Sequence, residues 1–200
     1  LSDMKYSLAI FCTLNQRGKN LQPLDKVKVD FFSKLTSDEL QREWNKYATL
    51  LGDDGFETCM TIIGKLLLGK QLDASDLGQV VEQVNPIMFM QNAFIPCCRA
   101  YHAIVNMHIT NNETCMTLNH ESVDELRVLI KLLHMNTRKK WIYVAVFLLG
   151  VLFCKDRRQY LKSNERRKAC MYVDNEEKTL EAVKKNLYKL ENLYFRTMIM

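Results

Sequence analysis

Glycine and proline are scarce in this 200-residue chain, with 7 and 3 residues respectively. All-β sandwiches and barrels need frequent turn residues, and phosphate-binding loops need clustered glycines, so the composition disfavours both. The seven cysteines form no C-x-x-C pair, which is the usual signature of a zinc or redox site. The whole chain is 48% hydrophobic and 10% aromatic, which is the composition of a folded globular protein.

The chain also lacks an apolar run long enough to cross a membrane. The run Trp141–Cys154 has fourteen residues, whereas a transmembrane helix needs about 20. We therefore expect a buried core helix there and no transmembrane helix. The odd number of cysteines, including Cys154 inside this run, is typical of reduced thiols. This indicates an intracellular protein, either cytoplasmic or nuclear.

Helix signals recur along the sequence. Thr36–Glu39 and Ser122–Glu125 have the pattern of capping boxes, each followed by apolar residues at helical spacing. Gly52–Gly55 predicts the end of one helix, and a last long helix is expected from Asp174, with Glu177 in the capping position. We predict an all-α protein, a compact bundle of roughly eight to ten helices.

The polar stretch Thr110–His120 divides the chain into two parts of different charge. We predict an N-terminal helical lobe at 1–110 and a basic C-terminal helical lobe at 120–200, unless the two pack as a single domain. Residues 1–110 carry 11 basic and 12 acidic side chains, whereas residues 111–200 carry 17 and 11. Within Arg138–Lys168 there are 10 basic and 2 acidic residues, so this segment is the main functional signal.

On an α-helix, Lys155, Arg158, Lys162 and Arg166 would form one ridge, and Tyr160 and Tyr172 would offer faces for stacking. The alternative is an ordinary solvated face. The predicted anion-binding residues are all the lysines and arginines of the segment: Arg138, Lys139, Lys140, Lys155, Arg157, Arg158, Lys162, Arg166, Arg167 and Lys168.

Two kinds of anionic partner could bind a surface with this density of positive charge. One is RNA or ribonucleoprotein, bound without sequence specificity because no recognised RNA-binding motif occurs. The other is an anionic membrane surface, although the sequence carries no lipidation motif. Small viral matrix and nucleocapsid-associated proteins have this character, and we expect a protein of that type.

The last predicted helix carries an apolar seam at three- and four-residue spacings: Leu180, Val183, Leu187, Leu190 and Tyr194. The seam either packs on the protein's own core or docks on a second subunit. The apolar C-terminal tail Phe195–Met200 favours self-association, so a homo-oligomer is expected.

Signals for catalysis or metal binding are weak. Cys98 and His102 lie four residues apart on one predicted helix, but a zinc site needs four converging ligands. His134 precedes a basic stretch and is expected at the surface or in a helix cap. We therefore expect no enzyme, no metal and no cofactor.

Ala48–Asp53 resembles the Gly-Asp centre of a helix motif of the Bcl-2 family of death regulators. In that resemblance the apolar run Trp141–Cys154 would be the buried central helix. It implies an alternative function, a helical protein-interaction module whose groove binds an amphipathic helix of a partner.

Overall fold

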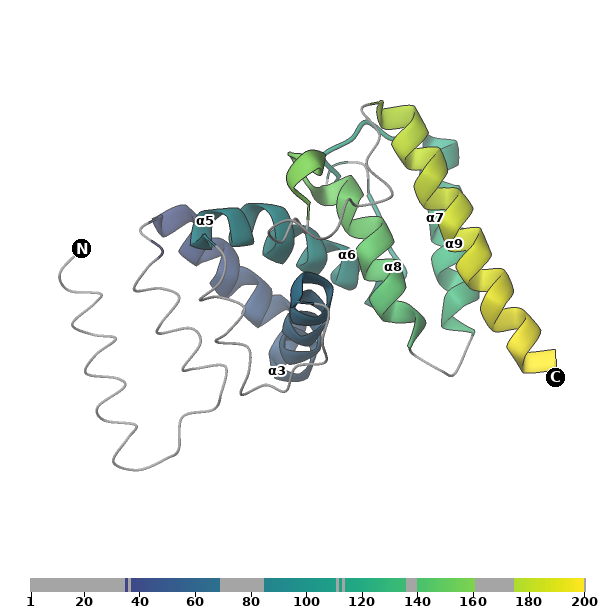
Figure 1. The fold of residues 1–200 in the computed structure, drawn as a ribbon, viewed down its shortest axis with the longest axis horizontal. Helices are drawn as coiled ribbons and strands as arrows, with labels where there is room; N and C mark the ends of the chain where they lie inside the picture. The colour runs from purple at the N-terminus through teal and green to yellow at the C-terminus, as the bar shows by residue number, and fades with distance from the viewer. Residues whose placement is uncertain are drawn as a thin grey trace. The chain divides into compact units, whose positions relative to one another are not determined.

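The computed structural model describes residues 35, 37–68, 85–110, 112, 114–135, 140–160 and 175–199, the side chains of 194–199 excepted. The regular structure in these ranges is helical, without a strand, which confirms the all-α prediction (Figure 1). The α-helices are α3 (Asp38–Leu68), α5 (Pro86–Phe89), α6 (Ile95–Val105), α7 (His120–His134), α8 (Trp141–Gly150) and α9 (Glu176–Ile199). A π-helical turn, Met90–Phe94, precedes α6, and 3₁₀ turns occur at Val151–Phe153 and Arg157–Gln159. The expected total of eight to ten helices concerns the whole chain and stays a prediction.

Backbone contacts group the chain into two compact units, Leu1–Met90 and Gln91–Met200. The polar stretch Thr110–His120 lies within the second unit. The division into lobes at 1–110 and 120–200, with its alternative of a single domain, stays a prediction.

In the first unit, α3 is two helical segments joined at Gly52, as the sequence predicts. Gly52 has φ 66° and ψ 176°, a left-handed backbone conformation that glycine adopts without steric cost. The ring of Trp44, before the kink, meets that of Phe56, after it, edge to face at 5.2 Å between centroids. Both side chains are buried, so the kink folds the two segments onto a shared apolar contact.

The second unit is built around α8. This helix packs against α6 and α9, and α9 packs in turn against α7. Trp141, Ala145, Val146, Leu148 and Leu149 of α8 are all buried, which confirms the prediction of a core helix. In the described part of the chain, no helix is both long and apolar enough to cross a membrane.

Asparagine side chains cap the N-termini of both α7 and α9. Asn119 Oδ1 accepts a hydrogen bond from the backbone N–H of Ser122 at 2.8 Å, and Asn175 Oδ1 accepts one from that of Lys178 at 3.1 Å. The predicted capping box at Ser122–Glu125 is therefore wrong by one turn, because the helix already begins at His120. An asparagine oxygen satisfies the same unpaired N–H that a serine hydroxyl would.

His134, predicted at the surface or in a helix cap, is half-buried in the last turn of α7 and contacts two other helices of the second unit. Its Nε2 lies 2.7 Å from the backbone carbonyl oxygen of Ile104 in α6. Its ring meets that of Trp141 in α8 edge to face, 5.1 Å between centroids. The histidine thus anchors the end of α7 on the core.

Candidate functional site

Four of the ten predicted anion-binding residues lie in the described part of the chain: Lys140, Lys155, Arg157 and Arg158. The other six lie outside it: Arg138, Lys139, Lys162, Arg166, Arg167 and Lys168. The prediction that these residues bind an anion remains open, but the structure constrains how the four can act together.

The helical ridge expected from Lys155 onward does not begin as an α-helix. Cys154 has an extended backbone (φ −94°, ψ 126°), and Arg157–Gln159 form a 3₁₀ turn. Asp156 Oδ1 accepts a hydrogen bond from the backbone N–H of Arg158 at 3.1 Å. Such a local side-chain bond competes with helix formation, so the α-helical spacing assumed for Lys155 and Arg158 is wrong.

The four described cations do not form one surface row. Lys140 precedes α8 and Lys155 follows its 3₁₀ extension, so about 20 Å of helix separates them. The side chain of Arg157 is 17% exposed and forms an ion pair with Glu176 at 3.1 Å. This pair attaches the basic segment to the start of α9 and neutralises the arginine.

Tyr160 packs the chain after the second 3₁₀ turn onto α8 and offers no stacking face, in contrast to the prediction. Its side chain is 4% exposed, and its hydroxyl donates to the backbone carbonyl of Val146 at 3.2 Å. Its ring stacks on Phe147, and the hydroxyl lies so close to Gly150 that a Cβ there would overlap it. Tyr172, the second predicted stacking residue, is outside the described residues.

The predicted seam of α9 packs inside the second unit. Leu180, Val183, Leu187 and Leu190 are buried, with exposed fractions of 9% or less, on a helix that contacts α7 and α8. This is the first of the two alternatives, packing on the protein's own core. Nothing is described of the side chain of Tyr194. Self-association through these residues stays a prediction.

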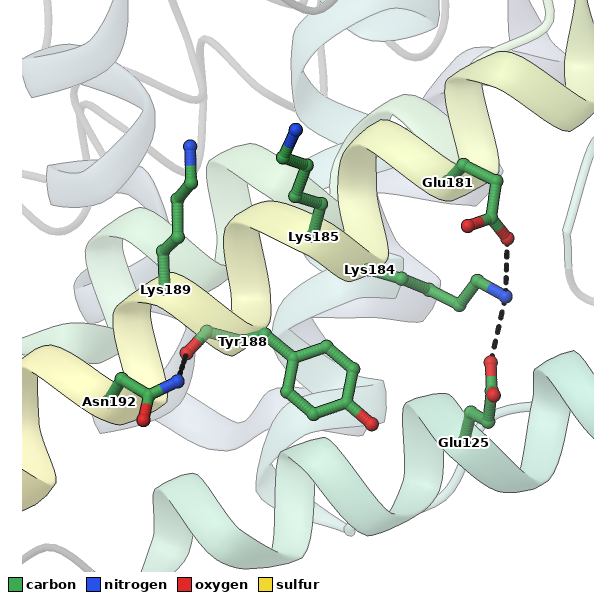
Figure 2. Close-up of a pocket in the computed structure, with 7 residues that line it drawn as sticks. All are labelled: Glu125, Glu181, Lys184, Lys185, Tyr188, Lys189 and Asn192. Atoms are coloured by element: carbon green, nitrogen blue, oxygen red, sulfur yellow. Dashed lines mark hydrogen bonds and ion pairs between the residues drawn. The ribbon is translucent and has the colours of Figure 1, made fainter.

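A groove of about 480 Å³ lies along α9, next to Glu125 of α7. Its lining is mostly polar and charged: Glu125, Glu181, Lys184, Lys185, Tyr188, Lys189 and Asn192. Figure 2 shows Tyr188 directed toward α7, whereas Lys185 and Lys189 extend from α9 away from it. The groove therefore has an aromatic side chain within it and two lysines along its outer edge.

Lys184 crosses the groove and ties its two helices together. Its ammonium donates to Glu125 of α7 at 2.8 Å and also pairs with Glu181 of α9 (Figure 2). Burial acts to lower the pKa of Lys184, but the hydrogen bonds to the two carboxylates outweigh it, so its pKa lies above 10.5. This lysine is consequently a structural cation whose charge is already compensated.

Further toward the N-termini of α7 and α9, a second hollow of about 560 Å³ is acidic. Its carboxylates are Glu121, Glu125, Glu176, Glu177 and Glu181. The first turns of both helices line it, so the helices run in the same direction, side by side (Figure 1). Helix N-termini favour negative charge. The α7–α9 face thus changes from acidic to basic along its length.

Sequence reasoning missed the pair Lys185 and Lys189 with Tyr188 between them. The density of positive charge along the chain does not reveal them, because α9 contains nearly as many acidic as basic residues. The signal that would have found them is register, because residues four apart share one face of a helix.

The structure describes both Cys98 and Cys154, which lie in the core of the second unit. Cys98 is fully buried, and no group of three or more His, Cys, Asp or Glu side chains in the described ranges is arranged to hold a metal ion. Cys154 is also buried, and burial raises the pKa of its thiol to about 12, so it is protonated at neutral pH.

The Gly-Asp pair behind the Bcl-2 resemblance lies at the kink of α3, where the Gly52 backbone leaves the helix. No protein-family model, no curated protein and no solved structure matches the chain. The chemistry of the candidate site is therefore argued from its own residues.

Proposed function

We propose that this is a non-enzymatic, self-associating protein that binds RNA or ribonucleoprotein without sequence specificity, through the basic surface of its second unit. The type is that of a small viral matrix or nucleocapsid-associated protein. The observation that carries the proposal is the distribution of charge. Residues 91–200 hold 18 basic and 11 acidic side chains, a net charge of +7, whereas residues 1–90 have a net charge of −2.

A polyanion suits this distribution better than a small ligand does. Exposed cations occur at several places on the second unit, among them Lys140, Lys155, Lys185 and Lys189. Each phosphate that such a side chain neutralises releases counterions, so many weak contacts sum to a salt-dependent affinity.

The direct test is fluorescence anisotropy of a labelled single-stranded RNA, titrated with the protein at low and at physiological salt. We expect binding at low salt that weakens steeply as salt rises. The triple variant Arg158→Glu/Lys162→Glu/Arg166→Glu, which lowers the net charge by six, should weaken it strongly. A matched reversal of three cations in the first unit, Arg42→Glu/Lys46→Glu/Lys65→Glu, should leave most of the affinity in place.

The alternatives make different predictions in the same assay. Absence of RNA binding at low salt would refute the proposal, and vesicles of phosphatidylcholine and phosphatidylserine would then test the anionic-membrane alternative. A protein-interaction module that holds a partner's apolar helix in a groove would instead bind with little dependence on salt.

A further inference from the structure

We propose that the RNA contact is centred on α9, where single-stranded RNA places a base against Tyr188 and neighbouring phosphates against Lys185 and Lys189. This inference rests on the proposed function and moves its centre away from the segment Arg138–Lys168. It names an interface that the charge density of the sequence does not indicate.

The lysines of α9 recur in register along one side of the helix. At 100° per residue, Lys178, Lys185 and Lys189 fall within about 20° of one line along α9, and Arg196 occupies the same register. Lys185 and Lys189 are about 6 Å apart along the helix axis, roughly the separation of adjacent phosphates on an extended strand. One strand lying along the helix can therefore contact both lysines with successive phosphates.

The charges of Lys185 and Lys189 are available to an anionic ligand. Lys185 and Lys189 are exposed, and no described residue forms an ion pair with either of them. Lys184, one position earlier, shows the contrast, because Glu125 and Glu181 already compensate its charge. Two like charges four residues apart disfavour the helix slightly, and an anionic ligand removes that repulsion.

The ring of Tyr188 offers a face on which a base can stack. Tyr188 is 48% exposed and lies in the α7–α9 groove, directed toward α7, whereas Lys185 and Lys189 extend from the outer side of the same turns of α9 (Figure 2). Asn192 lines the same groove one turn later, and its side-chain N–H donates to the backbone carbonyl of Tyr188 at 3.0 Å. Proteins that bind single strands typically combine cations for the phosphates with an aromatic face for the bases, and this part of α9 carries both.

The position of the ring favours a strand over the other anionic partners. The headgroups of a membrane form a broad surface that meets the lysines on the outer edge but leaves the ring in the groove without a contact. An amphipathic helix of a partner protein needs a row of apolar contacts, and Tyr188 is the one large apolar side chain that lines this groove. A nucleotide uses both features at once.

The acidic hollow at the other end of the helix pair sets the limit of the interface. Glu121, Glu176 and Glu177 lie there, and phosphates would be repelled from them. The contact is consequently confined to the part of α9 from Lys184 toward the C-terminus.

The test uses the full chain and three double variants that each remove two positive charges. They are Lys185→Gln/Lys189→Gln on α9, Lys155→Gln/Arg158→Gln in the predicted basic segment, and Arg42→Gln/Lys46→Gln in the first unit. Binding of labelled single-stranded RNA is measured by anisotropy over a range of salt concentrations. We expect the α9 variant to weaken binding about tenfold at low salt and to reduce the slope of log affinity against log salt by about 1.4, the value for two phosphate contacts. The first-unit variant should change the affinity less than about twofold.

A second pair of variants tests the ring. Tyr188→Ala should weaken binding about tenfold without altering the salt slope, because stacking involves no counterion release, whereas Tyr188→Phe should bind as the wild type does. The inference is overturned if the α9 variant matches the first-unit variant, or if alanine at position 188 matches phenylalanine, while the wild type still binds; the proposed function survives either result. It is also overturned if the α9 and Tyr188 variants lose binding to phosphatidylserine vesicles but retain RNA binding. Absence of binding by the wild type refutes both proposals.

Discussion

Helices α8 and α9 pack against each other, yet they contribute to the protein in different ways. The ten residues of α8 include no charged side chain, and six of them are buried. The 24 residues of α9 include nine charged side chains, and the helix buries a single seam. One helix forms the centre of the second unit, and the other closes that unit while presenting a charged face to solvent. Substitutions in α8 should thus change stability, whereas those on the outer face of α9 should change binding.

The largest effect is expected inside α8. Leu149→Ala removes a fully buried side chain and leaves a cavity, which should lower the free energy of unfolding by about 3 kcal/mol. Urea denaturation followed by circular dichroism measures the change. Val144→Ala on the same helix is the control, because Val144 is 43% exposed and its loss should cost less than about 0.5 kcal/mol. Equal losses for the two variants would contradict the assignment of a buried and an exposed side of α8.

A smaller effect is expected at the contact between Gly150 of α8 and Tyr160. Gly150→Ala places a methyl group against the hydroxyl of Tyr160, which must move and give up its bond to Val146. We expect a loss of about 2 kcal/mol in the free energy of unfolding, as for other overpacked sites. Tyr160→Phe removes the nearer of the two atoms that collide, the oxygen, and leaves only the ring carbon Cζ to shift, so the double variant should be more stable than the sum of the single changes implies. Strict additivity in the same denaturation assay would show that the two residues are not in contact.

The tie between α9 and α7 should matter less. Lys184→Met removes the ion pairs to Glu125 and Glu181, and because both carboxylates are partly exposed we expect a loss of about 1 kcal/mol at neutral pH. The pKa of Lys184 is raised in the folded state, so its stabilising contribution is complete below pH 10.5 and is lost as the pH rises through the folded pKa. Urea midpoints measured from pH 9 upward should therefore fall more for the wild type than for the variant. Parallel pH profiles would contradict this role for Lys184.

The smallest change in stability is expected on the outer face of α9. Lys185→Gln/Lys189→Gln removes two exposed charges without ion pairs among the described residues, so the free energy of unfolding should change by less than about 0.5 kcal/mol. Thermal unfolding checks this. A loss as large as that of Leu149→Ala would mean that the two lysines are structural, and any effect of this variant on RNA binding would lose its meaning.

The sequence was informative about burial and much less so about the surface. The apolar run of α8 predicted buried residues correctly, because apolar side chains leave water wherever the fold permits. For the seam of α9 the sequence left packing on the protein's own core and docking on a second subunit both open. The break at Gly52 was also predicted, since glycine adopts a positive φ at little cost.

The errors have a common physical origin in local hydrogen bonds and tertiary contacts. Asp156 turns the chain away from an α-helix, and Asn119 begins α7 earlier than the capping-box pattern indicated. Tyr160 is an aromatic residue that could stack on a base, but it is buried against α8, where Gly150 leaves room for its hydroxyl and the Val146 carbonyl accepts a hydrogen bond from it. The proposed role of Tyr188 depends on α7 lying beside α9, where Lys184 pairs with Glu125, 59 positions earlier, and periodicity in one segment does not reveal such a contact.

The chain has two tryptophans, and each belongs to a different compact unit. Trp44 in the first and Trp141 in the second are both 1% exposed, so the emission of each should shift to longer wavelength when its own surroundings open to water. Replacing either one by phenylalanine gives a chain with a single fluorescent reporter. Two such chains, unfolded in parallel, would show directly whether the two units lose their structure in one cooperative step or in succession.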